Sequence, residues 1–98
     1  MAAYLVAHLR MIDPAWTESE YTALLPSLME KHDGVYIAGG AHEQVEGEPL
    51  GEWTSLVRFP SLEAAQAFWN DPEYQRVAPL RRSGSESQVV LIDGVPAE

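Results

Sequence analysis

The sequence contains no cysteine among its 98 residues. This excludes disulfide bonds, thiolate nucleophiles and cysteine-ligated metal sites, and it is typical of proteins in a reducing, cytoplasmic setting. Basic residues are also scarce, since six Lys and Arg stand against fifteen Asp and Glu, for a net charge of −9. Only Arg81 and Arg82 are adjacent, so the chain lacks the basic stripe that nucleic-acid phosphates require. We therefore expect no nucleic-acid partner.

Long apolar runs are absent as well. The apolar segment near the N-terminus is short, is interrupted by His8 and Arg10, and has no basic residue before it. Such a segment is neither a signal peptide nor a membrane span, and we expect no membrane association. The length and the even composition predict one domain covering residues 1–98.

Apolar spacing predicts four strands and two helical regions. A helix over 15–32 carries an apolar stripe at helical spacing, and Pro26, which lies off this stripe, is expected to kink the helix rather than break it. The second helical region, 61–80, breaks at Asn70–Asp71–Pro72, where Asp71 is the expected N-cap and Pro72 the first helical residue. A polar turn is expected over 81–86. Strands are expected over residues 4–12, 34–40, 52–59 and 88–93.

This order, β-α-β-β-α-β, is the split βαβ arrangement of ferredoxin-like folds, an α+β class with a four-stranded antiparallel sheet. Two helices can cover only one face of such a sheet. The strands are nevertheless apolar on both faces, most clearly at Val89–Val90–Leu91–Ile92. We therefore predict a homodimer that buries the helix-free sheet face, with a small cavity between the two sheets or between sheet and helices.

Several segments together suggest a family: YLVAHLRMIDP, the first helix with its Tyr21 and Pro26, HDGVYIAGG, FPSLEAAQAFWNDPEYQ, Leu80–Arg81 and VVLIDG. Through these segments nearly the whole chain resembles the domain-of-unknown-function family 1330, which is similar to the dimeric α/β-barrel superfamily. The resemblance implies a ferredoxin-like fold and a dimer but no agreed activity. Members often carry an arginine where this chain has Ala38, and usually continue the last helix through the region of Pro79 and Ser83–Gly84–Ser85.

Five residues are candidates for a functional site, each with a structural alternative. His8 could be a general base, because a histidine titrates near neutrality, or a hydrogen-bonded interface residue. His42 lies in a loop, where it could bind a ligand or be solvated. Tyr36 and Trp53 could wall a pocket or simply pack. Arg58 could bind an anion or form a structural ion pair.

A further histidine, His32, ends the first helix, where a cap is the simpler role. The histidine positions 8, 32 and 42 match no metal-ligand motif, so we expect no metal site. No phosphate loop or nucleophile motif is present, and we expect no cofactor.

Three function hypotheses follow. The first is cofactor-independent oxidation or isomerisation of a small apolar or aromatic molecule, as in some superfamily relatives, with His8 as proton acceptor, Arg58 or Tyr36 orienting the substrate, and Trp53 as a wall. The second is a non-catalytic binding or stress-related module that uses the same cavity. The third is a purely structural dimer, which would need no cavity.

Overall fold

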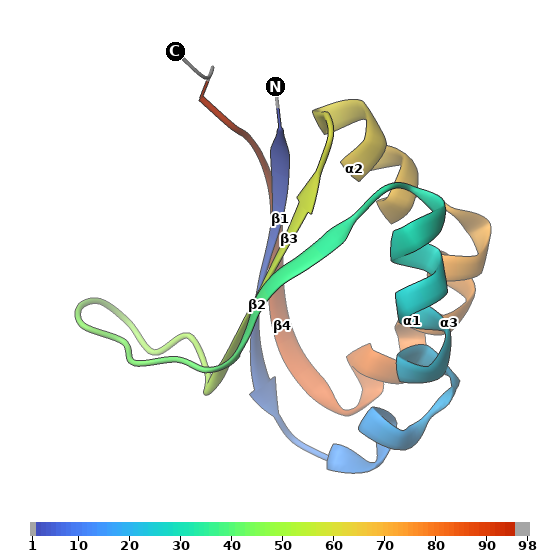
Figure 1. The fold of residues 1–98 in the computed structure, drawn as a ribbon. Helices are drawn as coiled ribbons and strands as arrows, with labels where there is room; N and C mark the ends of the chain where they lie inside the picture. Colours follow the sequence, from blue (N-terminus) through green and yellow to red (C-terminus); the bar gives the residue numbers. More distant parts are fainter. Residues whose placement is uncertain (1, 96–98) are drawn as a thin grey trace.

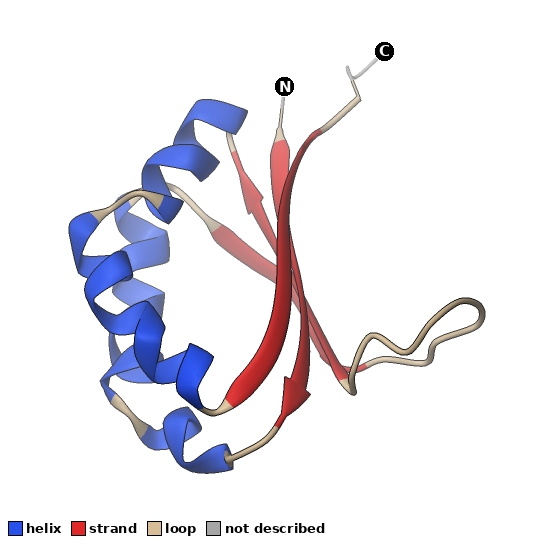
Figure 2. Ribbon diagram, turned by 180° about the vertical axis from the view of Figure 1, so that it is seen from behind, coloured by secondary structure: helices blue, strands red, loops and turns tan. Residues whose placement is uncertain are grey.

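The computed structural model of the protein describes residues 2–95. These residues form two layers, a four-stranded antiparallel sheet with the order β2-β3-β1-β4 and a layer of helices on one of its faces (Figures 1 and 2). This is the ferredoxin-like α+β fold predicted from the sequence. The elements are β1 (Ala3–Met11), the 3-10 helix η1 (Pro14–Glu18), α1 (Glu20–Lys31), β2 (Val35–Ala41), β3 (Trp53–Phe59), α2 (Leu62–Trp69), α3 (Pro72–Ser83) and β4 (Ser85–Asp93).

The core lies between the sheet and the helices. Alternate residues of β1 are buried against the helices, and Phe59, Ala65 and Val77 are fully buried. Phe68 stacks on Phe59 and on Tyr74, with ring centroids 5.4 Å and 4.7 Å apart. The opposite face of the sheet carries no helix (Figure 1).

The first helical region is divided, where the sequence predicted one helix over 15–32. Asp13 accepts the amide of Ala15 and starts the 3-10 helix. Ser19 ends it by donating to the Trp16 carbonyl at 2.6 Å, and its hydroxyl then accepts the amide of Tyr21 as the N-cap of α1. Because the Ser19 hydroxyl bonds a carbonyl of the preceding 3-10 helix and an amide of α1, it favours a break between two helices over one continuous helix. From Ser19 onward α1 continues through Pro26, as predicted.

The predicted break at Asn70–Asp71–Pro72 is confirmed. Asp71 is the N-cap of α3 and accepts the Glu73 amide at 2.9 Å, and Pro72 is the first helical residue. The same carboxylate holds the end of α1, because its second oxygen lies 2.8 Å from Lys31 Nζ and 2.7 Å from His32 Nε2.

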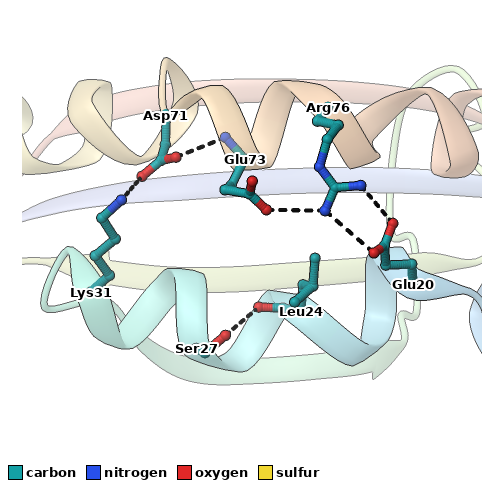
Figure 3. A network of polar contacts seen from close by, with 7 residues as sticks. All are labelled: Glu20, Leu24, Ser27, Lys31, Asp71, Glu73 and Arg76. Atoms are coloured by element: carbon teal, nitrogen blue, oxygen red, sulfur yellow. Dashed lines mark hydrogen bonds and ion pairs between the residues drawn. The ribbon is translucent and has the colours of Figure 1, made fainter.

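A network of polar contacts thereby joins α1 to α3 (Figure 3). At its other end Arg76 of α3 pairs with Glu20 of α1 at 2.7 Å and with Glu73 at 3.0 Å. His32 is the C-cap of α1, the structural role expected for it.

The predicted polar turn over 81–86 is wrong. Helix α3 continues through Pro79 to Ser83, and β4 begins at Ser85. The helix end is held instead by Ser85, whose hydroxyl donates to the Arg81 carbonyl at 2.7 Å, and by the Gly84 amide on the same carbonyl at 3.2 Å. Pro79 is exposed and removes only one helical hydrogen bond, so it does not end the helix.

The connection between β2 and β3 is a long loop that projects on the helix-free side of the sheet (Figures 1 and 2). Gln44 organises it, because its side-chain amide donates to the carbonyls of Glu46, Gly47 and Glu48 and accepts the Leu50 amide at 3.0 Å. At the loop's end Gly51 has φ +86°, and a Cβ there would lie 2.3 Å from the Leu9 carbonyl oxygen. This close approach requires glycine.

Candidate functional site

A cavity of about 330 Å³ lies between the inner face of the sheet and helix α1. Its floor is the inward row of β1, formed by Leu5, Ala7 and Leu9. Its walls come from the other strands and from the helices. The described lining residues include six aromatic side chains: Trp16, Tyr21, Tyr36, Trp53, Phe68 and Tyr74. The cavity is thus predominantly apolar and aromatic.

One end of the cavity is formed by β2 and β3. Tyr36 and Trp53 line it and are 45% and 39% exposed, so they stand at its opening to solvent. Both bind the same hydroxyl, because Tyr36 Oη and Trp53 Nε1 each lie 2.9 Å from Ser55 Oγ. Since the indole N–H can only donate, Ser55 accepts from Trp53 and is held in place between the two rings.

Gly39 determines the position of the Tyr36 ring. A Cβ at residue 39 would lie 1.7 Å from the Tyr36 hydroxyl oxygen, whereas a Cβ at Gly40 would meet nothing within 4 Å. The tyrosine therefore reaches Ser55 only because residue 39 has no side chain. The sequence predicted a bulge or bend at this glycine pair, and β2 does carry a register shift nearby, between Tyr36 and Ala38.

The other end of the cavity lies under α3. Tyr21 and Tyr74 line it, and their hydroxyls are 3.1 Å apart in a buried hydrogen bond. Burial, followed by the neighbouring Tyr74, raises the pKa of Tyr21 well above its ordinary value, and the nearby Arg81 guanidinium opposes this only in part. Tyr21 is therefore a neutral hydrogen-bonding group at physiological pH and not a base.

Arg81 is the charged group of this cavity. It is 4% exposed and lies in the last turn of α3, with its guanidinium carbon 5.8 Å from the centre of the Tyr21 ring. Its Nη1 donates to Ser87 Oγ, and its Nε has no hydrogen-bond partner within the described chain. No carboxylate or imidazole is among the described residues that line the cavity.

The histidine candidates lie on the opposite side of the sheet. His8 alternates with the buried residues of β1 and faces the helix-free side, where its Nδ1 lies 2.9 Å from Thr54 Oγ1. His42 Nδ1 lies 2.7 Å from the same hydroxyl, and the two imidazole rings are 6.0 Å apart. His8 also borders an open surface hollow, together with Arg10, the end of the projecting loop and Gln88.

Arg58 lies on the same helix-free face, paired with Tyr4 and Val35 in the sheet register, and it is exposed. Ala38 belongs to this face too, opposite Leu56. None of the ion pairs within residues 2–95 includes Arg58.

The predicted site residues therefore fall into two groups. Tyr36 and Trp53 meet at the opening of the cavity, whereas His8, His42 and Arg58 face away from it. The sequence analysis missed Ser55 and Arg81. Arg81 did carry a signal, because Tyr74, Val77, Ala78 and Arg81 follow the i, i+3, i+4, i+7 spacing of a buried helical face. An arginine in such a stripe is a buried cation.

Residues 2–95 contain no group of three or more His, Asp or Glu side chains placed to hold a metal ion. None of the helices in this range is long and apolar enough to cross a membrane.

The model of the family described as "Domain of unknown function (DUF1330)" matches residues 2–95. The chain belongs to the DUF1330 family. No curated protein matches the sequence.

Solved structures share the fold of this DUF1330 protein at low sequence identity. A protein of unknown function from Rhodopseudomonas palustris aligns with a TM-score of 0.71 and 16% identity over 98% of this chain and 84% of that one. A dimeric ferredoxin-like protein of unknown function from Jannaschia sp. CCS1 aligns with a TM-score of 0.72 and 17% identity, over 96% of this chain and 100% of that one. SnoaB, a cofactor-independent oxygenase from Streptomyces nogalater, aligns with a TM-score of 0.67 and 14% identity, over 98% of this chain and 95% of that one.

Proposed function

We propose that this DUF1330 protein binds a small, largely apolar aromatic molecule in the cavity between the sheet and α1. The observation that carries the proposal is the cavity itself. Its volume of about 330 Å³ falls within the range of ligand pockets, and its apolar floor and aromatic walls surround a few fixed polar groups. Ser55, held by Tyr36 and Trp53, is one such group, and it can hydrogen-bond a ligand that enters between these rings.

The experiment uses the glycine pair as a matched set. We expect the neutral two-ring compound 2-naphthamide or its anionic analogue 2-naphthoate to shift the indole N–H signals of Trp16 and Trp53 saturably in ¹H–¹⁵N spectra. Gly39→Ala should weaken this binding at least tenfold, because the new methyl group displaces Tyr36. Gly40→Ala, which meets open space, should leave it unchanged.

Absence of a saturable shift with both compounds would overturn the proposal. So would equal effects of the two glycine variants. The proposal would also be overturned if ligand shifted the NMR signals of His8 and His42 but not those of Trp16 and Trp53. That result would place the site on the other face of the sheet.

A second candidate function is cofactor-independent oxygenation in the same cavity. It is supported by the fold shared with SnoaB and by the enclosed aromatic environment next to a buried guanidinium. In such a reaction the substrate supplies the electrons: a CH₂ carbon takes one oxygen atom of O₂ as a carbonyl, and the other atom leaves as water with both hydrogens. Because no described lining residue is a carboxylate or imidazole, the substrate would have to ionise readily by itself.

Oxygen consumption tests this second candidate. An oxygen electrode would follow the purified protein with anthrone, whose acidic CH₂ lies between two rings, without added metal or cofactor. Catalysis predicts O₂ uptake above the uncatalysed rate, with one equivalent of anthraquinone per O₂. Uptake equal to the uncatalysed rate, together with saturable naphthamide binding, would favour the non-catalytic binding function.

We also propose that the protein is a homodimer formed through the helix-free face. Ala38, Leu56, Val6 and Val90 are in register across all four strands and make an apolar row on that face. Val90 and Ile92 are 56% and 55% exposed in the single chain. Apolar side chains in such an array mark an interaction surface, and the Jannaschia protein with the same fold is dimeric.

A further inference from the structure

Arg81 is a buried cation without an anionic partner in the described chain. The ion pairs of residues 2–95 involve Arg10, Lys31, His32 and Arg76, and none involves Arg81. A guanidinium does not lose its proton at physiological pH, so this side chain stays charged when it is removed from water. Burying an uncompensated charge is strongly unfavourable, and natural proteins pair or coordinate such groups.

The contacts that Arg81 does make compensate its charge only in part. It donates one hydrogen bond to a neutral acceptor, the Ser87 hydroxyl, and it lies near the face of the Tyr21 ring at 5.8 Å. A guanidinium carries five N–H donors in a planar fork suited to two oxygens of one acid group. The unpartnered Nε belongs to this fork.

We propose that the ligand of the cavity is an aromatic anion whose carboxylate or phenolate oxygen pairs with the Arg81 guanidinium. Arg81 lines the cavity, and the Tyr21 and Tyr74 hydroxyls lie at the same end. An anion there would receive the unused N–H groups and would cancel the buried charge. This inference rests on the proposed binding function and adds the charge and orientation of the ligand.

The positions of the two polar ends also set the length of the ligand. Ser87 in β4 is separated from β3, which carries Ser55, by the single strand β1. Two strand spacings amount to roughly 10 Å. Between the two serines the floor is apolar, formed by Ala7 and Leu9. A fused two-ring molecule with an acid at one end and a hydrogen-bonding group at the other fits this arrangement.

The test compares 2-naphthoate with 2-naphthamide, which have the same shape and differ in charge. Calorimetry should give at least tenfold tighter binding of the naphthoate to the wild-type protein. Arg81→Met, which keeps the length of the side chain and removes the charge, should abolish this preference. Arg82→Met, which alters the exposed neighbour in the same helix turn, should retain it.

The melting temperature without ligand gives a second readout. If the charge of Arg81 serves a ligand, Arg81→Met should melt at the same temperature as the wild type or higher, because replacing a buried uncompensated charge by an apolar group is often neutral or stabilising. A large drop in melting temperature would instead assign Arg81 a structural role and overturn the proposal. The wild-type comparison of the two compounds holds even if the variant does not fold.

The possible failures are distinguishable. Equal affinities for naphthoate and naphthamide would overturn the anion proposal and leave the aromatic binding site in place, whereas no binding of either would overturn both. Arg81 also borders a shallow outer hollow lined by Trp69. Naphthoate that shifts the indole signal of Trp69, but not those of Trp16 and Trp53, would place the anion outside the cavity and overturn the inference.

Discussion

Asp71 shows how one side chain can join two helices of this fold. It is 5% exposed, one of its oxygens caps α3 through the Glu73 amide, and the other binds Lys31 at the end of α1 (Figure 3). The second oxygen also binds the His32 imidazole. The Lys31 ammonium first, and then His32 and the Glu73 amide, hold the pKa of this carboxyl far below its usual range.

We therefore predict that Asp71→Asn lowers the melting temperature by several degrees at neutral pH. A group whose pKa is lower in the folded than in the unfolded state contributes stability above its unfolded pKa, and this contribution is lost as the pH falls through the folded value. The difference between wild type and variant should thus be constant above about pH 4 and shrink below it. Thermal melts from pH 7 to pH 2 measure this. Glu30→Gln, at an exposed acid outside the network, is the control, and a pH-independent difference for Asp71→Asn would contradict the prediction.

At the same scale, the sequence identified only part of the candidate site. The sequence offered Tyr36 and Trp53 as pocket walls or as packing residues, because both are large aromatic residues in strands, and both line the cavity. Strand alternation could not place the cavity on one side of the sheet, since both faces are apolar, and so His8 and Arg58 were grouped with residues that the sheet separates from them. Arg81 was missed because the predicted turn over 81–86 took it out of the helix.

At the scale of elements, boundaries followed the capping residues. The start of α3 at Asp71 and Pro72 could be predicted, because an N-cap residue followed by proline is typical of a helix N-terminus. The break at Ser19 could not be predicted, because a serine inside a periodic apolar segment also occurs within helices. The end of α3 was misplaced because Pro79 and Gly84 suggest an early stop, while the hydroxyl of Ser85, which closes the helix, gives no periodic signal.

Proline inside α1 leads to the second prediction. Pro26 is exposed and has no N–H to donate within a helix that continues on both sides of it. Pro26→Ala should raise the free energy of unfolding by roughly 1–2 kcal/mol, since the restored hydrogen bond outweighs the greater freedom of the unfolded chain. Urea denaturation measures the change. Pro60→Ala, outside any helix, should give no gain, and a destabilised Pro26→Ala protein would show that the proline shapes α1 for its packing.

At the scale of the whole molecule, the helix-free face is the surface that we propose forms the dimer. The sequence could predict that something covers this face, because β4 is apolar on both sides, but a periodic pattern does not name the covering partner. The structure adds that the projecting loop lies on the same side, with Val45 at 88% exposure. Both features fit a second copy of the chain packed on this face.

The third prediction tests that assembly. Val90→Lys places a charge at the β4 end of the apolar row, beside Ile92, where the proposed dimer would bury it without a partner. We expect light scattering to show the mass of a dimer for the wild type and of a monomer for the variant. Ala67→Lys, on an exposed position of α2 in the helical layer, should remain dimeric. A monomeric wild type at micromolar concentration, or a dimeric Val90→Lys protein, would contradict the proposed interface.

The hydroxyl of Thr54 has a consequence for the tautomers of two histidines. It lies within hydrogen-bond distance of Nδ1 of both His8 and His42, yet it owns a single hydrogen and can donate it to only one of them. The other imidazole must itself carry a hydrogen on Nδ1, and in the neutral ring this tautomer leaves Nε2 free to accept. Long-range ¹H–¹⁵N spectra should therefore show at least one of the two rings protonated at Nδ1, and Thr54→Val should let both rings take the common Nε2–H form. The helix-free face thus presents a ring nitrogen that can accept a hydrogen bond and points away from Thr54, on a surface that otherwise carries the apolar row and the exposed Arg58.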